Sequence, residues 1–166
     1  MALNWLSRRD YSENQLSQRL SRQGGEPADI ALVIAWCKRE NYLDQSRFLQ
    51  MLVRSRAGKG YGLNYIVQEC RQQQITKEQV LQCAAELGID WFAMASQQYL
   101  KKYGQSEVTD YKEKLKRMAY MQRRGFSNEH CYLLMAILRP NAHDLAKSNQ
   151  LMYQLGLMAQ AFRQQF

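Results

Sequence analysis

The residue types that enzymes and metal proteins use for chemistry are scarce in this chain of 166 residues. It has two histidines, His130 and His143, and its four cysteines form no C-x-x-C pair. Zinc sites need such ligands at short spacing, so no metal is expected. The acidic residues are scattered and neither histidine lies near a nucleophile motif, which argues against a two-metal nuclease and a nucleophilic triad. We therefore expect no catalytic residues and no cofactor.

Long apolar runs are also missing. No run approaches the roughly 20 residues that span a bilayer, and the N-terminus lacks the basic-then-apolar layout of a secretion signal. Three of the four cysteines fall on apolar helical positions, where a free thiol behaves as a small buried hydrophobe. These features predict a reduced, cytoplasmic protein with no membrane partner.

The sequence lacks the patterns of strands, and most of its glycines lie where helix ends are expected. Only two prolines occur, and eight of the nine glycines lie where a helix would begin or end. No segment alternates with period two between hairpin turns. The sequence predicts an all-α fold with helices at 2–10, 13–23, 27–40, 45–57, 63–73, 77–87, 91–103, 109–123 and 128–138.

One helix-opening pattern occurs three times, at Tyr11-Ser12, Ile75-Thr76 and Phe126-Ser127. The first two have a glutamine three residues after the cap, as in a capping box, and all three have the apolar residues of a hydrophobic staple. The apolar positions of the segment after Gly24 recur with a period near 50 residues. Such a period indicates stacked helical modules. We predict three tandem three-helix repeats at 1–43, 44–88 and 89–139.

The segment 140–166 differs from the repeats. Leu151, Leu155, Met158 and Phe162 fall on one face, which predicts a C-terminal amphipathic helical extension. It would pack back onto the third repeat or mediate self-association.

The net charge of +8 suggests an acidic partner such as nucleic acid, a nucleoprotein or an anionic membrane surface, although many soluble proteins are basic without one. A first basic cluster surrounds Ala57-Gly58-Lys59-Gly60-Tyr61-Gly62, which lacks the Walker spacing and a preceding strand. This loop is either a flexible interhelical turn with Tyr61 packed between modules or such a turn that also presents Lys59 to a polyanion. Arg54, Arg56 and Arg71 flank it.

A second basic run lies in the third repeat, where few acidic residues neutralise it. It is either a solvated helix face or a phosphate-binding surface, and Lys101-Lys102 would extend it. A weaker cluster in the first repeat has Arg8, Arg9, Arg19 and Arg22. The run in the third repeat comprises Lys112, Lys114, Lys116, Arg117, Arg123 and Arg124.

Three central segments carry a resemblance to a known family. Asn41 to Phe48, Val53 to Gly62 and Ile66 to Ile75 resemble the second module of the bacterial RecX family, whose members regulate the recombinase RecA. The opening at Tyr11-Ser12 and the joint at Ile89-Asp90-Trp91 also match, and coverage runs from about residue 3 to residue 138. One departure is Gln73-Gln74, which stands where the family more usually has Lys-Gly.

The resemblance implies an elongated, curved array of three-helix repeats that binds in the groove of a RecA filament on DNA. It implies inhibition of RecA ATPase, strand exchange and co-protease activities, and so a place in DNA repair, homologous recombination and the SOS response. The expected partners are the RecA filament and single- or double-stranded DNA, and the chain is expected to be a monomer.

The candidate contact residues follow from the basic clusters and this resemblance, and none of them is catalytic. An alternative is a sequence-nonspecific DNA-binding helical-repeat protein that acts without RecA. A helical-repeat RNA-binding or scaffold protein ranks lower, because no code-like pattern runs through the modules. The expected filament or DNA contacts are Arg54, Arg56, Lys59, Tyr61 and Arg71, followed by Lys112, Lys116, Arg123 and Arg124.

Overall fold

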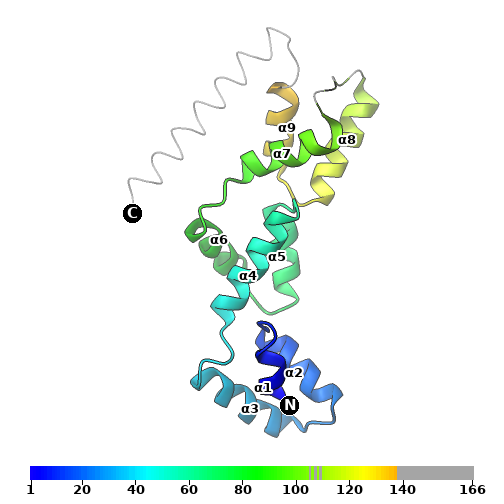
Figure 1. Cartoon of the computed structure of the whole chain (residues 1–166). Helices are drawn as coiled ribbons and strands as arrows, with labels where there is room; N and C mark the ends of the chain where they lie inside the picture. Colours follow the sequence, from blue (N-terminus) through cyan, green and yellow to red (C-terminus); the bar gives the residue numbers. More distant parts are fainter. Residues whose placement is uncertain (105, 107, 109, 138–166) are drawn as a thin grey trace. The chain divides into compact units, whose positions relative to one another are not determined.

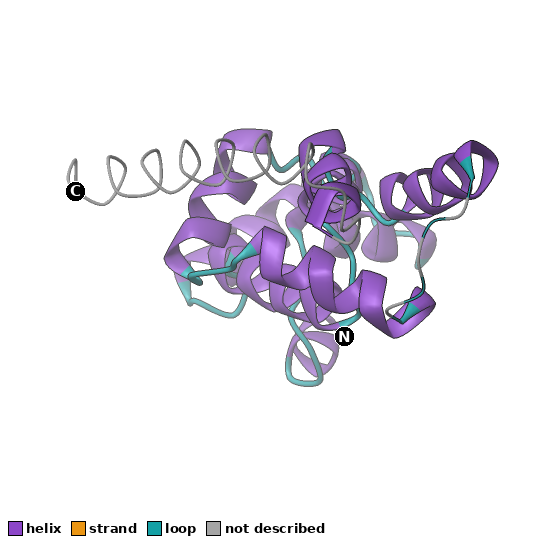
Figure 2. Cartoon of the chain, turned by 90° about the horizontal axis from the view of Figure 1, so that it is seen from above, coloured by secondary structure: helices purple, strands orange, loops and turns teal. Residues whose placement is uncertain are grey.

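The computed structural model describes residues 1–104, 106, 108 and 110–137, and it confirms the all-α fold (Figure 1). Within this part every regular element is a helix, and loops join consecutive helices, as Figure 2 shows. Each helix begins within two residues of its predicted start. The helices are α1 (Ala2–Leu6), α2 (Glu13–Arg22), α3 (Pro27–Arg39), α4 (Gln45–Gly58), α5 (Leu63–Arg71), α6 (Lys77–Glu86), α7 (Trp91–Tyr103), α8 (Tyr111–Arg123) and α9 (Asn128–Ile137).

The first helix is shorter than predicted, because α1 ends at Leu6 rather than at residue 10. The four residues that follow it have no apolar side chain to bury, and their polar groups bond elsewhere. Ser7 Oγ donates to the Asn4 carbonyl at 3.1 Å, and the carboxylate of Asp10 accepts from Arg47 Nε on α4. The chain therefore leaves the helical path before α2.

The described helices belong to two compact units. The first spans Met1–Asp90 and the second begins at Trp91, two residues after the predicted start of the third repeat. In the first unit α2 packs on α3, while α4 and α5 pack on each other and on α6; in the second, α7 and α8 pack on α9. The predicted extension at 140–166 lies outside the described residues, as does the end of the third repeat from Leu138 onward.

Side-chain caps explain where several helices begin. Ser12, Asp44, Thr76 and Asp110 each accept a hydrogen bond from a backbone N–H in the first turn. The capping box predicted at Thr76 is complete, but the one predicted at Ser12 is wrong in one half. Ser12 is fully buried, and its hydroxyl accepts from the Gln15 N–H and donates to Gln73 Oε1 at 2.6 Å. The missing half is the return bond, because the Gln15 side-chain oxygen accepts nothing from the described residues.

Residues in the left-handed conformation end most of the described helices. Five of these residues are glycines, which adopt a positive φ without strain. After α3 and α5 the same position is taken by Asn41, with φ of 56°, and by Gln74, with φ of 60°. The position of Gln74 is one that favours glycine, so this glutamine stores backbone strain.

The two units bury separate cores. In the first repeat Tyr11, Leu16, Cys37 and Leu43 pack together, and in the second unit a larger cluster surrounds Tyr99. All four cysteines are buried free thiols, as predicted for three of them. Burial raises the pKa of the Cys70 thiol to about 12, so it stays protonated and unreactive. Among the described helices none is long and apolar enough to cross a membrane.

Polar contacts join the first two predicted repeats within the first unit. Besides the bond from Ser12 to Gln73, Asn14 Nδ2 donates to the Gln72 carbonyl at 2.8 Å. Asp10 and Arg47 form an ion pair between the segment before α2 and α4. The turn after α5, where Gln73-Gln74 departs from the family pattern, is thus an anchor for the N-terminus of α2.

Candidate nucleic-acid interface

Arg56 is held inside the second repeat. From α4 its Nε and Nη2 atoms donate to both carboxylate oxygens of Glu69 on α5, in a bidentate pair whose side chains are 26% and 25% exposed. The hydrogen bonds to Glu69 raise the pKa of Arg56 above its ordinary value. Arg56 thus has an internal partner that its sequence neighbours did not reveal.

Lys59 and Tyr61 lie at the corner between α4 and α5, beside this pair. Lys59 is exposed at the C-cap of α4, and Gly60 turns the chain with φ of 76°. Tyr61 is half-buried and stacks on Tyr65 with ring centroids 4.1 Å apart. Tyr61 therefore packs on a residue of its own repeat, and Lys59 is exposed. Packing of Tyr61 between modules and binding of a polyanion by Lys59 stay predictions.

Arg54 and Arg71 lie on the α6 side of the second repeat rather than with Arg56. Arg54 is two residues from Arg56 on a helix, so the two side chains point in nearly opposite directions. Burial raises the pKa of the Cys83 thiol of α6, and the charge of Arg54 opposes that rise; hydrogen bonds lower the pKa of Glu78, and the charges of Lys77 and Arg71 add to this. Both arginines are exposed. The structure thus divides the predicted cluster between two sides of the second repeat.

In the third repeat Lys112 and Lys116 lie one turn apart on the exposed side of α8. Lys116 Nζ is 3.7 Å from Glu113, an exposed pair that contributes little to stability because water and salt screen it. Both ammonium groups are accessible to an external anion.

The end of α8 gathers further cations around one aromatic ring. Arg124 lies over the ring of Tyr120 at 5.6 Å from its centroid, and Lys102 of α7 lies over the same ring at 5.8 Å. Gln98 Nε2 donates to the hydroxyl of Tyr120 at 2.6 Å. Arg123 is exposed beside them at the last position of α8. We call Lys102, Tyr120, Arg123 and Arg124 the Tyr120 cluster; it brings Lys102 to the predicted basic run.

Arg117 belongs to the core of the third repeat, although the sequence placed it in the basic run. It is 5% exposed, and its guanidinium donates to Glu113, to the Tyr99 hydroxyl and to the Ser106 carbonyl at 2.8 to 2.9 Å. Burial would lower the pKa of Arg117, but the bonds to Glu113 and Tyr99 raise it. This arginine therefore ties the segment before α8 to α7 and α8.

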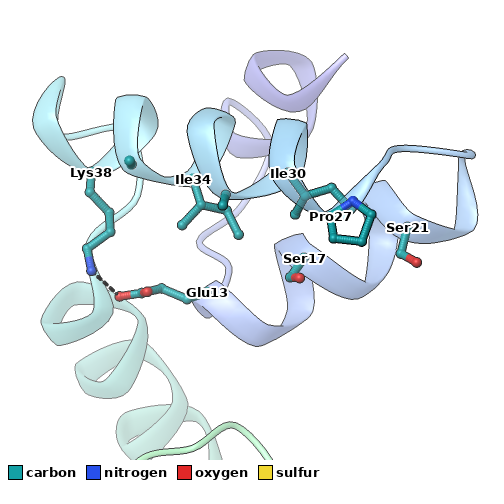
Figure 3. A pocket seen from close by; sticks show the side chains of 9 residues that line it. Glu13, Ser17, Ser21, Pro27, Ile30, Ile34 and Lys38 are labelled. Carbon is teal, nitrogen blue, oxygen red and sulfur yellow. Dashed lines mark ion pairs between the residues drawn. The ribbon is translucent and has the colours of Figure 1, made fainter.

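Another surface has a different chemistry. A groove of about 480 Å³ runs between α2 and α3, lined by small and apolar residues such as Ser17, Ala31 and Ile34. Figure 3 shows the Glu13–Lys38 ion pair, 2.7 Å long, at one end of it. In the part of the chain that the structure describes, no three histidine, cysteine or acidic side chains gather as a metal site would require.

Comparisons with known proteins show the family of this chain. Residues 1–37 match the RecX first three-helix domain, and residues 89–135 match the RecX third three-helix domain. Regulatory protein RecX of Salmonella heidelberg (strain SL476) is 36% identical over 135 residues, covering 75% of this chain and 81% of its own length. The protein of that name from Escherichia fergusonii is 37% identical over 138 residues, covering 77% and 83%.

The fold also has a solved relative. The crystal structure of RecX from Lactobacillus salivarius superposes with a TM-score of 0.66 at 15% identity, over 82% of this chain and 91% of that one. It supports the helical architecture, while the sequence identities above carry the family assignment. The chain belongs to the RecX family of regulatory proteins.

Proposed function

We propose that this protein is a non-catalytic regulator that binds the groove of the RecA–DNA filament in the cytoplasm and inhibits RecA ATPase, strand exchange and co-protease activities. Membership of a family of regulatory proteins is the observation that carries the proposal. The exposed cations of the second and third repeats support it, because a nucleoprotein groove offers both DNA phosphates and acidic side chains.

The proposed contacts follow the exposure of each side chain. Arg54, Lys59 and Arg71 present charge from the second repeat. Arg56 acts through Glu69 by fixing the α4–α5 corner that carries Lys59 and Tyr61. In the third repeat the proposed contacts are Lys112 and Lys116, together with Arg123 and Arg124 of the Tyr120 cluster. Repeats that bind side by side along the groove would bridge adjacent RecA protomers and oppose the movements coupled to ATP turnover.

Reversing two charges tests this assignment. Arg54→Glu with Lys59→Glu is expected to weaken inhibition of RecA's DNA-dependent ATPase by tenfold or more, because each reversal costs about 1 kcal/mol at a partly desolvated contact. The matched control is Arg39→Glu with Lys77→Glu, which reverses two exposed charges of the same unit elsewhere. Helicity is checked by circular dichroism. Equal inhibition by the two double variants would move the interface away from the second repeat.

A second candidate is a sequence-nonspecific DNA-binding protein that needs no RecA, and the net charge of +8 is the observation in its favour. It predicts tight binding to bare DNA with a salt slope of about 0.9 per neutralised phosphate on duplex. Affinities for bare and RecA-coated DNA distinguish the two. A marked preference for coated DNA favours the regulator, and equal affinity favours the second candidate.

A further inference from the structure

A polar groove with three arginines lies along α2 in the first repeat. It has a volume of about 400 Å³. No carboxylate is among the described residues that line it. Tyr11 forms part of the wall, together with Arg9, Arg19, Arg22, Gln15, Gln18 and Gln23. We call this the Arg22 groove.

The groove follows one face of a helix. Gln15, Gln18, Arg19, Arg22 and Gln23 are spaced as residues that share a side of α2 and its C-cap. This stripe is about 12 Å long, given the rise per residue of a helix. The one acidic residue of α2, Glu13, is engaged elsewhere, in the ion pair with Lys38 of α3 (Figure 3). The stripe therefore combines positive charge with side-chain amide donors.

Aromatic rings, rather than carboxylates, hold two of the arginines. The guanidinium of Arg19 lies 4.3 Å from the ring centroid of Trp5 and donates to the Tyr11 hydroxyl. Arg9 lies 4.1 Å from the ring centroid of Tyr11. Stacking on a ring orients a guanidinium without neutralising it. Burial would raise the pKa of Tyr11, yet the two arginines hold it below its ordinary value, as expected in a positive local field.

One residue that lines the groove, Gln15, has an unsatisfied side-chain oxygen. Gln15 Oε1 is buried and accepts no hydrogen bond from the residues that the structure describes. It is the glutamine whose predicted capping role at Ser12 is not filled. Rotation of this side chain toward the groove would present its NH2 group, which can donate to an anion. A buried acceptor without a donor costs free energy, so the side chain sacrifices no hydrogen bond of this oxygen when it rotates.

We propose that the Arg22 groove binds the phosphodiester backbone of a nucleic-acid strand. Guanidinium and glutamine amide groups are common donors to phosphate oxygens. Phosphates of one B-form strand follow each other every 3.4 Å along the axis, so a stripe of about 12 Å spans more than one of them. Tyr11 is 4% exposed, which leaves its ring no free face for stacking on a base. The contact is therefore independent of sequence.

This groove adds a nucleic-acid contact in the first repeat to the regulator proposed above, and it rests on that function for its biological setting only. The test uses the full chain and two probes without RecA: a fluorescent oligothymidylate and a fluorescent duplex. Arg9→Gln with Arg22→Gln is compared with Arg8→Gln with Arg39→Gln, which removes two exposed arginine charges of the same repeat outside the groove. Arg19 stays, because it packs on Trp5.

The groove variant is expected to bind both probes about tenfold more weakly. Its salt slope on the single strand should fall by about 0.7 for each lost phosphate contact. The control variant should keep most of the wild-type affinity and most of the wild-type salt slope. Arg22→Gln alone should show half of the slope change without disturbing Arg9 over Tyr11.

Equal affinities and slopes for groove and control variants would overturn the proposal. So would failure of the wild-type protein to bind either bare probe, or displacement of the probes by inorganic phosphate alone at matched ionic strength. These outcomes say nothing against RecA regulation, which is read separately as inhibition of RecA ATPase. Conversely, a protein that binds bare strands through the groove but leaves RecA unaffected would refute the proposed function only.

Discussion

Variants of the Arg56–Glu69 pair can distinguish whether Arg56 stabilises the fold or contacts the filament itself. Both side chains are about three-quarters buried, at 26% and 25% exposure, and the pair is bidentate. Losing an exposed ion pair costs up to about 1 kcal/mol, and breaking a buried one costs about 3 to 5 kcal/mol. Arg56→Glu, which places two carboxylates together, should therefore cost about 2 kcal/mol.

A cost of this size is measurable in a small unit. For a unit of roughly 90 residues it lowers the unfolding midpoint by roughly 10 °C. The exchanged pair, Arg56→Glu with Glu69→Arg, restores the attraction and should recover more than half of the loss. Chemical and thermal denaturation of the wild type, both single variants and the exchange give the coupling energy of the pair.

The exchange then decides what Arg56 does. If Arg56 acts only by fixing the α4–α5 corner, the refolded exchange variant should inhibit RecA within about twofold of wild type, since Lys59 and Tyr61 keep their places. A stable exchange variant that has lost inhibition would show that Arg56 itself touches the filament. A single Arg56→Glu variant as stable as wild type would refute the energetic reasoning.

Three further changes test the fold. Gln74→Gly should stabilise the first unit by about 0.5 to 1 kcal/mol in urea denaturation, because relief of the left-handed strain exceeds the added entropy of the unfolded chain; a loss of stability would contradict this. Ser12→Ala should cost about 2 kcal/mol, since it removes both the cap and the bond to Gln73, whereas Ser46→Ala, at an exposed position, should be neutral. Arg117 bonding holds the pKa of Glu113 below its ordinary 4.5. The stabilisation from this pair is thus present above about pH 4.5 and lost as pH falls further, so Glu113→Gln should flatten the acid limb of the stability profile, and an unchanged limb would exclude the pair as its source.

The helices were predictable because their signals are local. Caps such as Asp44 and Thr76 mark where a helix begins, and the glycines that follow the helices mark where they end. Both signals act within one turn, so they can be recognised in the sequence. The end of α1 was not predictable in the same way, because it depends on Asp10 meeting Arg47 of α4. The bond from Ser12 to Gln73 was not predictable either, because its two residues are distant in the sequence, and the Gln15 side chain leaves the predicted capping box at Ser12 incomplete. The elongated, curved shape and the three-repeat boundaries stay predictions.

The candidate site was predictable in composition but not in geometry. A sequence shows how many arginines a segment has, and it does not show which of them meet a carboxylate. Arg56 and Arg117 both look like surface charge, yet one pairs with Glu69 and the other is buried among Glu113, Tyr99 and Ser106. The sequence ranked Arg9, Arg19 and Arg22 in the weaker cluster, and it did not show that they line one groove. Helical spacing along α2 contained part of that signal, but the place of Arg9 depended on the early end of α1.

The most direct test of the central claim is a density map of this protein on a RecA filament formed on DNA. The account predicts density that lies along the helical groove, with α4 and α8 placing Arg54, Lys59, Lys112 and Lys116 toward RecA or the DNA backbone. Filaments that stay bare at saturating protein, or density confined to the outer rim with these side chains facing solvent, would contradict it.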